Sequence, residues 1–214
     1  MSSLEPIEAV IERARAAMRV SKPLVCERCR SAAADGGNMT CTPCTRALAT
    51  TETIGARYKW ARFDSPLMLA RANGQANIDR VRALVGVPLV MFVGPAGSSK
   101  TSLATALLRA SCEAAGVSGV WADARSLAES KGAWKHGTPD PETIARAKRS
   151  RWCLIDEVGA ESGYGVAEVI HARDLACLPM IITTVEDSAA LVLRYGDGIA
   201  RRVWESAKLV QLGG

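Results

Sequence analysis

The chain has 214 residues, of which 48% are hydrophobic and 23% are charged, and its formal net charge is +5. These values exclude a fully disordered chain and a collagen-like chain, and the length allows one domain with a small extra module. The mild basic excess permits contact with nucleic acid but does not demand it. The longest apolar run near the middle, residues 87–93, is far short of the roughly 20 residues that cross a bilayer, so we expect no membrane contact.

Residues 4–20 carry apolar side chains at helical spacing, with acidic residues early and basic residues late. That order suits the helix dipole and predicts a helix. The same region lacks the continuous apolar segment of a secretory signal. We therefore expect a cytoplasmic protein, whose thiols stay reduced.

Two cysteine pairs follow, Cys26 with Cys29 and Cys41 with Cys44, and eleven residues lie between the pairs. A Cys-x-x-Cys turn supplies two thiolates from one bend, and two such turns complete a closed tetrahedral zinc site. We predict a structural zinc bound by these four cysteines, in an N-terminal module over residues 1–50. Four unrelated buried cysteines, or a redox pair, are the alternatives.

A linker is expected over residues 51–65, ahead of a core over residues 66–214. Its segment 57–64, RYKWARFD, interleaves basic and aromatic side chains. Such a segment can bind single-stranded nucleic acid by stacking and charge. Alternatively, it packs Trp60 and Phe63 on the core and on an adenine base.

Beyond residue 66 the hydrophobic pattern alternates between helical and strand spacing. We expect strands at 88–93, 119–122, 152–155 and 180–184, and helices at 66–84 (with a possible break at Gly74), 101–115, 143–148 and 166–176. Continuous apolar strands alternating with helices predict an α/β fold with a parallel sheet covered on both faces.

A glycine-rich segment stands between the first of these strands and its helix, and it resembles a Walker A phosphate loop. Its predicted nucleotide-binding residues are Gly94, Pro95, Ala96, Gly97, Ser98, Ser99, Lys100, Thr101 and Ser102. Glycines let backbone N–H groups converge on phosphate oxygens, and the helix N-terminus adds its dipole. Lys100 would neutralise the β- and γ-phosphates, and the Thr101 hydroxyl would bind Mg²⁺. The usual motif has glycine in place of Ser99, whose side chain we expect to crowd the phosphates or alter the loop.

The strand at 152–155 runs into Asp156 and Glu157, and this segment resembles a Walker B motif. Asp156 would hold the Mg²⁺ shell, and Glu157 would orient and polarise the attacking water. An exposed acidic turn is the alternative.

Two later segments bear on catalysis. The strand at 180–184 would lie beside the Walker B strand and present Thr183 or Thr184 near a γ-phosphate, unless both simply fill the strand. Arg201 and Arg202 fall on an expected short helix. They would either reach a neighbouring subunit's γ-phosphate as an arginine finger or form a solvated basic face.

Together these segments resemble AAA+ ATPases, and within them the DnaC- and DnaI-like helicase loaders and the related IstB-like transposition helpers. The resemblance covers about residues 57–210 and rests on WARFD, GPAGSSKT, LIDEVG, IITT and YGDGIARRV. It implies a three-layer P-loop core with five parallel strands, ATP and Mg²⁺ at a subunit interface, and remodelling of a partner protein on DNA.

The resemblance also suggests particular roles. It assigns the arginine finger to Arg202, with Arg201 as the alternative, and the first sensor to Thr184, because Val185 replaces the usual asparagine. Twelve residues follow Arg202, which implies a core without a full C-terminal lid. The implied function is an ATP-dependent helicase loader in replication initiation. It would bind a replicative hexameric helicase through residues 1–50, as well as single-stranded DNA and further copies of itself. An IstB-like ATPase helper of a transposase, or a zinc-containing nucleotide-binding adaptor without turnover, is the alternative.

Overall fold

The computed structural model describes Glu8, Glu12 and residues 25–30, 40–132, 141–161 and 165–213. The chain divides into two compact units, Met1–Thr45 and Arg46–Gly214. Apart from Glu8 and Glu12, which are helical, the helix expected over 4–20 lies outside the described residues. No helix within the described ranges is both long and apolar enough to cross a membrane.

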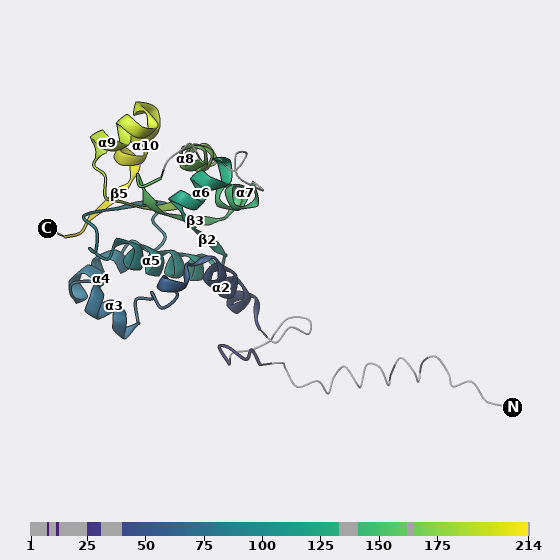
Figure 1. The fold of residues 1–214 in the computed structure, drawn as a ribbon. Helices are drawn as coiled ribbons and strands as arrows, with labels where there is room; N and C mark the ends of the chain where they lie inside the picture. The colour runs from purple at the N-terminus through teal and green to yellow at the C-terminus, as the bar shows by residue number, and fades with distance from the viewer. Residues whose placement is uncertain are drawn as a thin grey trace. The chain divides into compact units, whose positions relative to one another are not determined.

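The second unit alternates helices and strands, as Figure 1 shows. The elements are α2 (Thr42–Thr53), a 3₁₀ turn (Ala56–Tyr58), α3 (Pro66–Arg71), α4 (Gln75–Arg82), β1 (Leu89–Val93), α5 (Lys100–Ala115), β2 (Gly119–Asp123), α6 (Ala124–Gly132), α7 (Pro141–Arg149), β3 (Trp152–Val158), α8 (Gly165–Leu175), β4 (Met180–Thr184), α9 (Ser188–Tyr195), α10 (Asp197–Ser206) and β5 (Lys208–Gln211). The helix expected over 66–84 is two helices, because the chain turns through positive φ at Asn73 and Gly74.

The five strands form one parallel sheet in the order β2-β3-β4-β1-β5. This confirms the predicted α/β fold and the expected pairing of β3 with β4. The strand expected over 152–155 is longer in the structure, because β3 continues through Asp156 and Glu157. A register shift between Ile155 and Val158 interrupts its pairing with β4 at this point. The acidic pair therefore lies within an irregular strand end, not in a separate turn.

Helices cover both faces of the sheet, so the central strands β1, β3 and β4 are largely buried on both sides. On one face, α5 packs Leu103, Leu107 and Leu108 against strand residues such as Phe92 and Leu154. The opposite face packs Met91, Ile155 and Ile182 against residues of α6, α8, α9 and α10. In Figure 1, α3, α4 and α5 lie on one side of the sheet and α6 to α10 on the other. The carboxyl ends of the central strands then meet at one edge, where open parallel sheets place ligands.

The outer edge of β2 is covered by side chains instead of another strand. Thr50 Oγ1 accepts a hydrogen bond from the Gly119 N–H at 2.9 Å, and Thr53 Oγ1 accepts one from the Trp121 N–H at 2.9 Å. Both threonines lie on α2. An edge strand otherwise presents unpaired N–H groups that can pair with another chain.

A buried arginine joins α8 to α7 and to the start of β4. Arg173 is 0% exposed. Its Nη1 donates to the carbonyl oxygens of Ala147 at 2.6 Å and Ser150 at 2.9 Å, and its Nη2 donates to the Pro179 carbonyl oxygen. No carboxylate in the described ranges pairs with this guanidinium. The carbonyl groups at the C-terminal end of α7 instead stabilise the positive charge, as the helix dipole allows.

Replacing Arg173 with methionine is expected to lower the free energy of unfolding by about 3 kcal/mol, because buried carbonyl groups lose their donors. For a unit of this size that corresponds to a fall in Tm of roughly 6–12 °C. Thermal unfolding followed by circular dichroism measures the change. Arg146→Met, on the exposed face of α7, is the matched control and should alter the Tm little. Equal melting of the two variants would contradict the structural role of Arg173.

Candidate functional site

The predicted phosphate loop lies between β1 and α5. Gly94 passes so close to the end of β5 that a Cβ there would lie 2.2 Å from the Leu212 carbonyl oxygen. Lys100 is 8% exposed, and its Nζ donates to the carbonyl oxygens of Gly94 at 2.6 Å and Pro95 at 2.7 Å. Burial lowers the pKa of Lys100, while the charges of Asp156 and Glu157 oppose that change. The lysine therefore reaches across the loop that is expected to hold phosphates.

Ser99, the departure from the usual motif, adopts a left-handed conformation with φ +67°. Such a conformation costs a residue with a Cβ about 1 kcal/mol. Its hydroxyl donates to the backbone carbonyl of Arg71, the last residue of α3. The hydroxyl therefore anchors the loop to α3. That the Ser99 side chain crowds the phosphates or alters the loop stays a prediction.

The acidic pair at the end of β3 is organised by a threonine of β4. Thr183 Oγ1 donates to Asp156 Oδ1 at 2.6 Å and accepts the Glu157 N–H at 2.9 Å. Glu157 has φ +58°, and its side chain is exposed while its neighbours in β3 are buried. Strained backbone of this kind clusters at functional sites. The irregular strand end thus turns the Glu157 carboxylate outward and keeps Asp156 inside.

Asp156 and Thr101 form the candidate magnesium site. Burial raises the pKa of Asp156 to about 6, while hydrogen bonds from Thr183 and Thr101 oppose the rise. A hydroxyl and a carboxylate oxygen are the kind of hard ligands that Mg²⁺ takes from proteins, so these residues fit the predicted ion.

One cavity of about 360 Å³ collects these groups. Its walls are Arg57, Tyr58, Arg71, Ala96, Gly97, Ser98, Ser99, Lys100, Thr101, Ser102, Glu157, Val158, Ala160, Thr184 and Val185. The phosphate loop and the catalytic acid predicted from sequence thus share a single cavity. Trp60 and Phe63 pack against the apolar cluster that includes residues of α5, which confirms their expected packing on the core. Their contact with an adenine base stays a prediction.

Thr184, the predicted sensor, lies on the cavity wall but is fully buried. Its hydroxyl donates to the Val158 carbonyl oxygen at 2.7 Å and accepts the Glu186 N–H at 3.0 Å. Of the two threonines that the sequence left open, Thr183 is the one that contacts the acidic pair. The catalytic role assigned to Thr184 stays a prediction.

Both candidate finger arginines lie on α10, outside the cavity. Arg202 Nη1 pairs with Asp174 Oδ2 at 3.4 Å, and Arg201 Nε pairs with Glu205 Oε1 at 3.8 Å. The side chains of both arginines and of Glu205 are mostly exposed and that of Asp174 is partly exposed, so neither pair adds much stability. An arginine that serves the γ-phosphate of another subunit must be available at the surface, and both residues meet that requirement. The choice between them stays a prediction.

The four cysteines of the first unit form a cluster. Their sulfur atoms all lie within 4.8 Å of one another. Cys29 Sγ and Cys41 Sγ are 3.7 Å apart, close to the edge of about 3.8 Å of a tetrahedron with Zn–S distances near 2.3 Å. The Cys41 N–H donates to Cys26 Sγ at 3.3 Å. Backbone N–H groups of Cys29 and Cys41 lower the pKa of Cys26 to about 6, whereas burial raises the pKa of Cys44 to about 12. The donor set and its spacing fit a closed zinc site.

The comparisons with solved structures agree with this geometry. The chain is similar to the DnaC helicase loader, with 23% identity and a TM-score of 0.58 over 74% of this chain and 100% of that one. It is similar to DnaI, with 20% identity and a TM-score of 0.58 over 75% of this chain and 92% of that one. The chain therefore has the fold of these two structures. This confirms the fold that the resemblance drawn from the motifs implies.

A more distant likeness is to AMPPCP-bound DnaA from Aquifex aeolicus, with 18% identity and a TM-score of 0.54 over 74% of this chain and 50% of that one. At these identities a likeness shows a shared fold. No protein-family model matches the chain, and no curated protein matches it.

Some residues at the site were not identified from sequence. Arg71 lines the cavity, although nothing in its local pattern distinguishes it from a surface arginine at a helix end. Glu161, buried just after β3, also went unnoticed. The sequence shows only an acidic residue shortly after the Asp156–Glu157 pair. The folded structure is needed to show that its side chain is buried.

Proposed function

We propose that the protein is a Mg²⁺-dependent ATPase that acts as a helicase loader in the initiation of DNA replication. The observation that carries this proposal is the cavity in which Lys100 and Thr101 of the phosphate loop meet Glu157 of β3. The solved structures of similar fold support it, since they include the helicase loader DnaC and a DnaA bound to AMPPCP, an ATP analogue.

In the proposed reaction, backbone N–H groups at the start of α5 and the Lys100 ammonium bind the phosphates. Thr101 and Asp156 would hold Mg²⁺, which supplies neutralisation of the charge on the transferred phosphoryl group. Glu157 accepts a hydrogen bond from water and orients it toward the γ-phosphorus. Thr183 keeps both acids in place through its two hydrogen bonds.

The proposed partners follow from the same fold. Residues 1–50, with zinc bound by Cys26, Cys29, Cys41 and Cys44, would bind a replicative hexameric helicase. Single-stranded DNA would contact the basic residues of the segment 57–64, in which Arg57 and Lys59 are exposed. Copies of the chain would assemble through ATP, with Arg202 of one subunit reaching the γ-phosphate bound by the next.

Replacing Glu157 with glutamine is expected to lower ATP turnover at least about a hundredfold, because the water loses its proton acceptor. ATP affinity should stay close to that of the unsubstituted chain. Phosphate release at saturating ATP and Mg²⁺, with and without single-stranded DNA, measures the effect. Glu129→Gln, on the exposed face of α6, is the matched control.

Each outcome separates the candidate functions. Unchanged turnover in Glu157→Gln would remove Glu157 from catalysis, and absent turnover in the unsubstituted chain would identify a nucleotide-binding adaptor. A loader binds a hexameric helicase, and the full-length Cys26→Ser variant should lose that binding. Long ATP-dependent filaments on duplex DNA would instead identify an IstB-like transposition helper.

A further inference from the structure

A buried carboxyl group outside the cavity joins β3 to α9. Glu161, which follows β3 by three positions, is 3% exposed. Its Oε2 accepts the Gly159 N–H at 2.8 Å, and its Oε1 accepts the hydroxyl of Tyr195. No lysine or arginine side chain among the described residues pairs with this carboxyl group. Its two neutral donors are therefore indispensable, since a buried carboxyl without donors is strongly destabilising.

The residue before Tyr195 adds a second bond between the same two segments. Arg194 Nη1 donates to the Glu161 backbone carbonyl at 2.6 Å. Burial and the hydrogen bond to Glu161 raise the pKa of Tyr195 far above its usual range, so the phenol stays protonated and donates. The C-terminal end of α9 is thus fixed to the segment that follows β3 by one side chain–side chain bond and one side chain–backbone bond.

The segment after β3 is in turn fixed to the segment after β4. Gly159 has φ +101°, and a Cβ there would lie 2.5 Å from Glu186 Cγ. Thr184 bridges the same two segments through Val158 and Glu186. A displacement of Glu157 at the end of β3 would therefore also move Glu161, because only three residues of chain lie between them.

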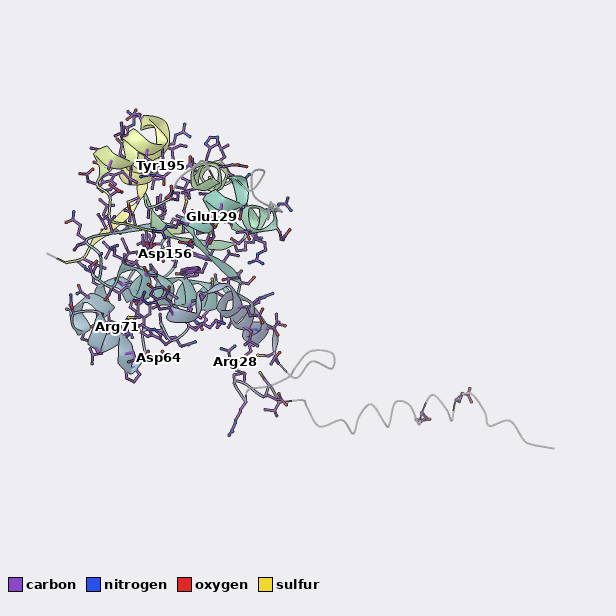
Figure 2. All side chains as sticks on the ribbon, viewed as in Figure 1. Arg28, Asp64, Arg71, Glu129, Asp156 and Tyr195 are labelled. Carbon is purple, nitrogen blue, oxygen red and sulfur yellow. The ribbon has the colours of Figure 1, made fainter. Side chains whose placement is uncertain are left out.

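Tyr195 leads directly into the helix that carries the candidate finger. Gly196, with φ +83°, turns the chain from α9 into α10, and the two helices pack on each other. Figure 2 marks Tyr195 beside α9 and α10, on the face of the sheet opposite α5, and Asp156 at the sheet. The bond between Glu161 and Tyr195 thus stands between the proposed catalytic acid and Arg202.

We infer that Glu161 and Tyr195 are positioning residues that hold α10 so that Arg202 reaches the γ-phosphate bound by the neighbouring subunit. The inference rests on the proposed function, because it needs a finger that acts between subunits. It adds a chain of contacts through which the nucleotide site of one subunit controls the position of its own Arg202. That arginine in turn reaches the γ-phosphate bound by the next subunit. The chain of contacts consists of β3, Glu161, Tyr195 and α10.

Mixed assemblies of full-length chains test this inference. An acceptor chain carries Arg202→Ala, so its own ATP site is intact but it offers no finger. A donor chain carries Glu157→Gln, so its own site is inactive but it offers Arg202. Each chain alone should turn over ATP slowly, and their equimolar mixture should recover turnover at the acceptor's site. An acceptor with Arg125→Ala, at an exposed arginine of α6, in place of Arg202→Ala is the matched control and should turn over ATP without a donor.

Tyr195→Phe is then added to one chain at a time. In the donor it should lower the recovered turnover at least about tenfold, since misplacing a catalytic group by about 1 Å costs up to a hundredfold. In the acceptor it should change the recovered turnover less than about twofold, and it should leave the acceptor's ATP affinity unchanged. A purely structural role would instead lower turnover in whichever chain carries the substitution.

Failure of this inference and failure of the finger assignment give different results in these mixtures. If the parent mixture recovers turnover and the Tyr195→Phe donor recovers it equally well, or both positions lose it equally, the positioning role is overturned and the proposed function stands. If the parent mixture recovers nothing, the finger assignment falls, and this inference falls with it. Glu161→Gln is the second variant should Tyr195→Phe melt at a much lower temperature. Its amide oxygen can accept the Gly159 N–H while its NH2 donates to the Tyr195 hydroxyl oxygen, so it should retain most of the recovered turnover. Glu161→Ala in the donor should lose it.

Discussion

Replacing Lys100 with alanine is expected to lower the affinity for the ATP analogue AMPPCP by more than about a hundredfold. Removing one charge from a buried hydrogen-bonded pair costs about 3 kcal/mol, and each 1.4 kcal/mol is tenfold in affinity. Lys100 is mostly buried, and its Nζ already lies at the loop that would hold the phosphates. No other lysine lines the cavity in the part of the chain that the structure describes.

Isothermal titration calorimetry with AMPPCP and Mg²⁺ measures this affinity. Lys208→Ala removes an exposed lysine of β5 that does not line the cavity, and its affinity should equal that of the unsubstituted chain. Because both variants lose one positive charge, the pair separates a local contact with phosphate from the effect of net charge. Equal affinities would remove the phosphate-loop assignment.

Replacing Cys26 with serine is expected to abolish zinc binding and to unfold the first unit while the second unit keeps its stability. Zinc in a closed four-thiolate site contributes folding free energy directly, and a small module has little core to replace it. Cys26 is fully buried, and its sulfur accepts a backbone N–H from Cys41. A serine oxygen is a poor replacement for a thiolate ligand of zinc.

Zinc content per chain, measured by mass spectrometry of the metal in protein purified under reducing conditions, tests this expectation. Cys177→Ser, an exposed cysteine after α8, is the matched control and should keep one zinc per chain. A full equivalent of zinc in Cys26→Ser, or none in the unsubstituted protein, would refute the four-cysteine site.

Sequence patterns predicted the parts of the fold that depend on local chemistry. Strands β1, β3 and β4 are continuous apolar runs, and the phosphate loop lies between β1 and α5 as expected. In contrast, β5 has four residues, of which one is buried, so its pattern is too weak to predict a strand from sequence. The hydrophobic pattern did not predict helix α6 either.

The contacts that shape the candidate site could not be read from sequence, because they join segments far apart in the chain. The Ser99 hydroxyl bonds to Arg71, 28 positions away, and Thr183 bonds to Asp156, 27 positions away. Local spacing also left Thr183 and Thr184 equivalent, since both are β-branched residues at a strand end. Only the irregular pairing of β3 with β4 shows which of them reaches the acidic pair.

The threonines on α2 have a consequence for assembly. By accepting the N–H groups of Gly119 and Trp121, Thr50 and Thr53 leave fewer free donors at the β2 edge for a foreign strand to pair with. If copies of the chain assemble through nucleotide, as proposed above, edge-to-edge strand pairing would compete with that contact. The two hydroxyl groups on α2 would then favour reversible association over aggregation at this edge of the sheet.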